Sequence, residues 1–174
     1  MKKYISFAFM AIALSFGFAG CSTETSEEPG GTNVQKMAGR WDVQVDIVDE
    51  SGNLIMADPF RMGTITIMTY NTADNSMNQM WLDDNGEFRA FKMKVDVDYQ
   101  ARTFSCPEKD YDAAGTGTAV VTGGKILEGA AKNLHGMPND SIVFNIKFSD
   151  DEYPEKYGFD HYLVTGTRHT GFTE

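Results

Sequence analysis

Hydrophobic and polar residues alternate along most of the chain after Ala38, and this alternation predicts β-strands. In residues 40–48, Trp41, Val43 and Val45 take every second position, with polar residues between them. Successive side chains of a strand point to opposite faces, so this spacing gives a strand with one apolar face. Similar short strands are predicted at 62–70, 77–82, 87–98, 101–106, 116–122, 125–131, 141–148 and 159–169.

Turn sequences separate several of these strands. Asp84-Asn85-Gly86 is typical of a tight hairpin, and Gly123-Gly124 predicts a second turn between the strands that flank it. One helical turn is expected at residues 153–157, and no other window shows a convincing helical period.

About nine antiparallel strands joined by short turns predict an all-β fold, either a closed barrel or a sandwich. Closure is favoured because it leaves no exposed edge strand. We expect an antiparallel β-barrel of about eight strands over residues 39–174, wide enough for packed side chains or one small ligand.

The first residues have the pattern of an export signal. Lys2 and Lys3 precede an uncharged stretch that ends at Gly20, too short to span a membrane. Phe18-Ala19-Gly20-Cys21 resembles the lipobox of bacterial lipoproteins, which implies cleavage after residue 20 and a lipid anchor on Cys21. The alternative is an ordinary secretory signal. With the lipobox, the protein is expected in the cell envelope as an outer-membrane lipoprotein.

Residues 21–38 are predicted to be the lipidated cysteine and a flexible linker, rich in Ser, Thr, Glu and Gly. Glu24, Glu27 and Glu28 resemble the acidic export tags of Bacteroidetes surface lipoproteins. A solvated tether explains them equally well, so the side of the membrane that the protein faces stays open.

The charge balance narrows the possible partners. The chain has 15 Lys and Arg against 25 Asp and Glu, a net charge of −10. Nucleic acids attract clustered positive charge, so no nucleic-acid partner is expected. With three His and two Cys, the sequence points to no metal site and no cofactor. If Cys21 carries lipid, Cys106 has no partner for an internal disulfide.

Two short motifs near the ends of the predicted barrel form a recognisable pair. Gly39-Arg40-Trp41 opens the first strand, and Gly166-Thr167-Arg168 lies near the end of the last one. The pair resembles the signature of lipocalins and other calycins. The resemblance implies that Arg168 lies across the Trp41 ring and closes the barrel floor, a cation–π contact.

The chain also resembles a narrower group, the lipid-anchored calycin-like proteins of Bacteroidetes, which are named as lipid-binding hydrolases. The segments that carry this resemblance are Gly-Arg-Trp-Asp-Val, Asp-Asn-Gly-Glu-Phe, Lys-Met-Lys-Val-Asp-Val-Asp and Gly-Thr-Arg-His-Thr-Gly-Phe. It implies a fold and a place in the envelope more firmly than an activity.

Catalytic residues are harder to find. His135, Asp140 and Ser141 lie within seven residues, but no nucleophile elbow or oxyanion turn accompanies them, so a polar turn is the simpler interpretation. Cys106 is expected to be a buried bystander, and the acidic residues 150–152 a solvated turn rather than a calcium loop. The sequence therefore indicates no catalytic site.

We therefore predict a binder of a small apolar molecule or lipid, attached to the membrane through its anchor. The predicted inward-facing ligand contacts are Val45, Ile65, Ile67, Phe91, Met93 and Tyr162. One alternative is a surface interaction module with a filled barrel that contacts other envelope proteins, and another is an esterase-like hydrolase. A cavity larger than about 300 Å³ would favour the binder.

Overall fold

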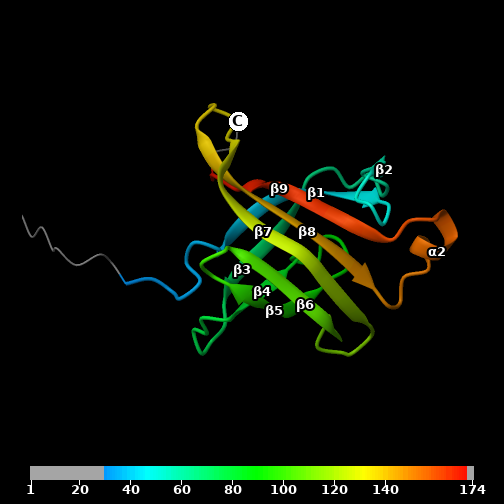
Figure 1. Cartoon of the computed structure of the whole chain (residues 1–174), viewed down its shortest axis with the longest axis horizontal. Helices are drawn as coiled ribbons and strands as arrows, with labels where there is room; N and C mark the ends of the chain where they lie inside the picture. The colour runs from blue at the N-terminus through cyan, green and yellow to red at the C-terminus, as the bar shows by residue number, and fades with distance from the viewer. Residues whose placement is uncertain (1–29, 172–174) are drawn as a thin grey trace, which may run out of the picture. The chain divides into compact units, whose positions relative to one another are not determined.

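The computed structural model describes residues 30–171, and the strands among them form a closed antiparallel β-barrel (Figure 1). Eight strands close the ring in the order β1-β3-β4-β5-β6-β7-β8-β9, with β9 paired to β1. They are β1 (Gly39–Val48), β3 (Ile65–Asn71), β4 (Gln79–Asp83), β5 (Lys92–Asp98), β6 (Thr103–Asp110), β7 (Thr118–Lys132), β8 (Pro138–Phe148) and β9 (His161–Arg168). The all-β barrel expected from the sequence is confirmed.

Two short elements stand outside this ring. The strand β2 (Leu54–Ala57) pairs with the end of β1, where β3 no longer does. The helix α2 (Tyr153–Tyr157) links β8 to β9 and is the single turn expected there. Both lie at the barrel end where β1 and β8 finish and β9 begins, which we call the mouth. The opposite end, where Trp41 and Arg168 lie, is the Trp41 end.

The inward faces of the strands fill the barrel with apolar side chains. Alternation puts every second residue of β1 and β5 inside, as in Val43, Val45, Met93 and Val95, each no more than 1% exposed. The largest fully buried side chains include Trp41, Tyr162, Phe91 and Phe144. The barrel interior is therefore a packed core.

The turn predicted at Gly123-Gly124 is wrong, because β7 runs through it as one strand. The pairing registers of β7 with both of its neighbours shift near these residues, so the strand bulges and bends instead of reversing. Gly123 has a φ of +63°, and a Cβ on Gly124 would lie 2.4 Å from the carbonyl oxygen of Phe104. These glycines serve a bulge and a close strand approach, not a hairpin.

β4 and β5 pair as the predicted hairpin, but the tight turn predicted at Asp84-Asn85-Gly86 is wrong, because β5 begins only at Lys92. The buried Asp84 carboxylate accepts hydrogen bonds from the backbone N–H groups of Gly86, Phe88 and Arg89. This carboxylate folds residues 84–91 into a compact loop that places Phe88 and Arg89 at the mouth.

The segment before β1 differs in part from the flexible linker expected for residues 21–38. Val34 and Met37 are fully buried in the core, and the N–H groups of Met37 and Ala38 both bond to the carbonyl of Val34. A spacing of three residues in one helical turn puts both apolar side chains on the same side. The packed unit therefore begins at Gly31. Cys21 and the predicted signal lie outside the described residues.

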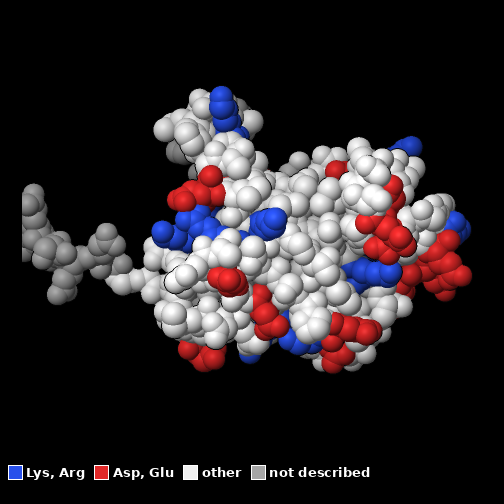
Figure 2. All heavy atoms as spheres, viewed as in Figure 1, with Lys and Arg blue, Asp and Glu red and all other residues white. Residues whose placement is uncertain are grey.

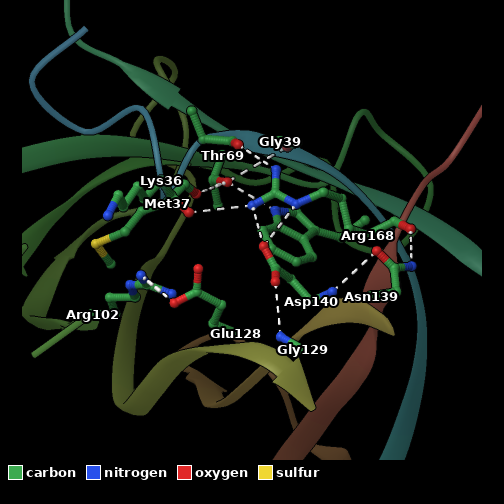
Figure 3. Close-up of polar contacts among 12 residues, drawn as sticks. Lys36, Met37, Gly39, Thr69, Arg102, Glu128, Gly129, Asn139, Asp140 and Arg168 are labelled. Atoms are coloured by element: carbon green, nitrogen blue, oxygen red, sulfur yellow. Dashed lines mark hydrogen bonds and ion pairs between the residues drawn. The ribbon is translucent and has the colours of Figure 1, made fainter. Parts of the chain in front are cut away.

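Arg168 holds the Trp41 end together (Figure 3). Its guanidinium carbon lies 4.4 Å from the centre of the Trp41 ring. Its nitrogens donate to the carbonyls of Ala38 at 2.6 Å and Lys36 at 3.2 Å, and to the Asp140 carboxylate at 3.2 Å. One side chain thus joins β9 to β1, to β8 and to the segment before β1.

Two glycines leave room for this arrangement. A Cβ on Gly39 would lie 2.2 Å from Nη1 of Arg168, so only glycine leaves that position free for the guanidinium. A Cβ on Gly166 would lie 2.1 Å from the carbonyl oxygen of Asp42, so glycine there lets β9 approach β1. The glycines of both motifs are therefore explained by packing.

Replacing Arg168 with leucine should lower the free energy of unfolding by about 2–4 kcal/mol, because the cation–π contact is lost and two carbonyls and a partly buried carboxylate lose their donor. Urea unfolding followed by tryptophan fluorescence measures this. Lys147→Gln is the control, since it removes an exposed ion pair with Asp160 and should cost less than about 1 kcal/mol. Equal effects of the two substitutions would contradict this role of Arg168.

Replacing Gly39 with alanine should cost about 1–3 kcal/mol, because the added methyl displaces the guanidinium. The same measurement in an Arg168→Leu background should show a much smaller cost, since the clash is then absent. Gly30→Ala, where nothing lies within 4 Å of the added Cβ, should be neutral. Additive effects of the Gly39 and Arg168 substitutions would argue against direct coupling.

Candidate functional site

Aromatic rings close the core at the mouth. Phe88 lies over Tyr162 with ring centres 5.3 Å apart, and Phe60 contacts both rings at 5.7 and 5.8 Å. Phe148 lies 5.9 Å from Phe88. These tilted and edge-to-face contacts are the favourable geometries for aromatic pairs. Loop residues thus cover a mouth that the strands leave open.

A polar network under the start of α2 fixes one side of the mouth. The Tyr162 hydroxyl donates to the Asp151 carboxylate at 2.6 Å, and the backbone N–H of Tyr153 donates to the same carboxylate. Burial and this hydrogen bond raise the pKa of the Tyr162 phenol, so it stays a neutral donor. Arg89 pairs with Asp150 at 2.8 Å and lies over the ring of Phe148. These bonds fix the first residue of α2 to the barrel.

Beside this network lies an apolar groove of about 400 Å³, which we call the mouth groove. Its lining residues are Ile47, Ile55, Met56, Pro59, Phe60, Tyr153, Tyr157 and Phe159. They come from β1, from β2 and the loop after it, and from α2 and the residues that follow it. Several of them are open to solvent, including Met56 at 54% exposed and Tyr157 at 57%. Exposed apolar side chains clustered around a groove of this volume are typical of a binding site.

Local contacts shape both walls of the groove. On one wall, the Asp58 carboxylate accepts from the N–H groups of Met62 and Gly63, and its own N–H donates to Asp46. This holds the loop that presents Phe60. On the other wall, Tyr153 and Tyr157 lie one helical turn apart and their rings stack at 5.6 Å. The groove is thus preformed.

The predicted ligand contacts lie in the core and not in this groove. The side chains of Val45, Ile65, Ile67, Phe91, Met93 and Tyr162 are all at most 5% exposed. Tyr162 comes nearest to the groove, through its ring contact with Phe60. A role for these six residues in ligand binding stays a prediction.

Sequence reasoning missed the groove because it looked only for alternating positions. Leu54, Ile55 and Met56 form a continuous apolar run in β2, where all four residues are exposed. A run of this kind, followed by Pro59 and Phe60 and placed between polar turns, was the available signal.

The structure gives other roles to two of the residues considered for catalysis. The Asp140 carboxylate accepts hydrogen bonds from Arg168 and from the N–H of Gly129. Cys106 is buried, its thiol donates to the carbonyl of Lys94, and burial raises the pKa of that thiol. A raised pKa leaves little reactive thiolate at neutral pH.

His161, the first residue of β9, and His169, which directly follows the strand, each pair with an aspartate. Nδ1 of His161 lies 2.7 Å from Asp160, and Nδ1 of His169 lies 2.8 Å from Asp42. Within residues 30–171, no group of three or more His, Cys, Asp or Glu side chains could hold a metal ion. Over the same residues, no helix has the length and apolar character needed to cross a membrane.

Comparison with known proteins gives a family. A search of curated proteins finds no match to the chain. The model of the family described as "Lipid-binding putative hydrolase" matches residues 26–173, which include the whole barrel and part of the segment before it. The chain therefore belongs to this lipid-binding family.

Proposed function

We propose that this protein is a lipid-anchored envelope protein that binds a small apolar molecule or lipid in the mouth groove. The observation that carries the proposal is an open apolar groove of about 400 Å³ on a barrel of a lipid-binding family. Burying an apolar ligand there gains roughly 25 cal/mol for each Å² removed from water, before ordering costs.

The packed interior favours the groove over the barrel axis as the binding place. Side chains such as Ile67, Phe91 and Phe144 are fully buried at the centre, so a ligand on the axis would have to displace them. In the groove, by contrast, Ile55 and Met56 already stand exposed. Ligand binding there requires no rearrangement of the core.

Within the barrel unit, the segment before β1 lies at the Trp41 end, opposite the mouth groove. Val34 and Met37, the first buried residues of the part that the structure describes, belong to the same core cluster as Trp41, and Thr69 bonds to both Trp41 and the carbonyl of Met37. The proposed place is the outer membrane, and the proposed attachment is a lipid on Cys21.

A second candidate is a surface interaction module, which the filled barrel and one exposed hairpin favour. The hairpin between β7 and β8 carries Leu134 at 75% exposed and Met137 at 62%. Two apolar side chains on a loop are a smaller surface than the mouth groove, so ligand binding is the better supported function.

Replacing Met56 with aspartate together with Tyr157→Ser should weaken binding of a neutral apolar dye such as Nile red by about tenfold. The double change removes apolar contact area worth about 1–2 kcal/mol and puts a charge in the groove. Dye fluorescence titrated against purified protein measures the affinity.

The matched control is Leu134→Ser, which also removes an exposed apolar side chain but far from the mouth. It should leave the dye affinity unchanged. Both variants alter exposed residues, so both should fold. Loss of binding in the Leu134 variant, with the groove variant unaffected, would support the interaction module instead.

Replacing Cys21 with serine should release the protein from the membrane fraction, because a thioether-linked lipid needs the thiol. Fractionation of cells with mass spectrometry of the mature N-terminus measures this. Cys106→Ser is the control and should leave the protein in the membrane fraction. Serine at position 21 with unchanged membrane attachment would rule out the proposed anchor.

A further inference from the structure

The mouth groove is apolar, but its rim is acidic. At one end it shares Phe159 with a hollow whose other lining residues are Asp49, Glu50, Ser51, Gly158 and Asp160. At the other end it shares Tyr153 with a hollow lined by Arg89, Asp150, Asp151, Glu152 and Lys156. The two hollows together hold six carboxylates against two cations. Figure 2 shows acidic side chains gathered over the end of the barrel that carries α2.

Several of these carboxylates have no cationic partner. Arg89 pairs with Asp150 and Asp151, and Lys147 pairs with Asp160 at 3.2 Å. Among the residues that the structure describes, no Lys or Arg forms an ion pair with the remaining three, which are Asp49, Glu50 and Glu152. The ammonium of Lys156 lies 5.2 Å from the Tyr157 ring centre. The charge left over around the groove is therefore negative.

Local bonds keep two rim carboxylates ionised. The side-chain and backbone hydrogen bonds from Asn53 lower the pKa of the Asp49 carboxyl. The hydrogen bond from His161, followed by the contact with Lys147, lowers the pKa of the Asp160 carboxyl. Both groups carry a full negative charge at neutral pH.

We propose that the mouth groove selects amphiphiles with a cationic head group and disfavours anionic ones such as fatty-acid carboxylates. This inference rests on the proposed function, in which the groove binds an apolar ligand. The tail would lie against Met56, Phe60 and Tyr157, and the head would remain at the acidic rim. Charges at a solvated rim act over a Debye length of about 8–10 Å at moderate salt, which reaches a head group held at the end of the groove.

The test compares three probes with the same twelve-carbon tail: dodecyltrimethylammonium, a neutral dodecyl polyoxyethylene ether and laurate. Isothermal titration calorimetry, below the micelle concentration of each probe, gives the three affinities. At about 20 mM salt, the cation should bind about tenfold more tightly than laurate, with the ether between them. At about 500 mM salt, the ratio of these two affinities should fall to about twofold, because salt screens the interaction of the head groups with the rim charges.

Variants that neutralise carboxylates show whether the rim causes the head-group preference. Glu50→Gln with Glu152→Gln should lower the ratio of the affinity for the cation to the affinity for laurate by about threefold. The affinity for the neutral ether should stay the same. The matched control is Asp74→Asn with Asp98→Asn, which removes two exposed carboxylates near the Trp41 end and should leave the difference unchanged. An equal effect of both double variants would mean that net charge, and not the rim, sets the preference.

The outcomes separate this inference from the proposed function. If laurate binds as tightly as the cation or more tightly, and Met56→Asp with Tyr157→Ser weakens both, the groove binds apolar ligands but the head-group preference is wrong. If none of the three probes binds, or if the groove variant binds all three normally, then both the proposed function and this inference fail.

Discussion

The guanidinium of Arg168 on the face of Trp41 is the contact on which this barrel depends. The two residues stand opposite each other in the register of β1 and β9, so the contact holds the seam where the first and last strands meet. The same side chain donates hydrogen bonds to the carbonyls of Lys36 and Ala38. One side chain therefore both holds the seam of the sheet and attaches the segment before β1. A planar group with several fixed donors suits this task, and a lysine could not make all of these bonds.

The two ends of the barrel are closed by different chemistry, and this difference places the candidate site. At the Trp41 end, hydrogen bonds from Arg168 hold Asp140 of β8 and the carbonyls of Lys36 and Ala38. At the mouth, ring contacts of Phe60, Phe88 and Tyr162 cover the core, and α2 has no buried residue of its own. A five-residue helix held by surface rings and one carboxylate opens more easily than a bonded strand. The mouth groove therefore lies at the end where a ligand would disturb the bonded strands least.

The sequence predicts the barrel well and the groove poorly, for physical reasons. Alternation reveals any strand with one buried face, which is why β1, β5 and β8 are recognisable. It cannot reveal β2, whose residues are all exposed, or the loop at 84–91, which depends on three backbone bonds to one buried carboxylate. The sequence also predicts two strands where the structure has the single strand β7, because a Gly-Gly pair is typical of a turn and of a bulge alike. The groove is built from the elements without a periodic signal.

Exposure of the groove residues is itself an argument for a ligand. The barrel has enough interior to bury its large apolar side chains, as the fully buried Phe144 and Tyr162 show. Ile55, Met56 and Tyr157 nevertheless stand together on the surface, where they gain nothing for folding and favour association. The acidic rim limits that association, because two copies of a chain with a net charge of −10 repel each other when their mouths approach. Under the proposed function, like-charged rims disfavour contact between two mouths, and the groove would favour a small molecule whose charge is opposite to that of the rim.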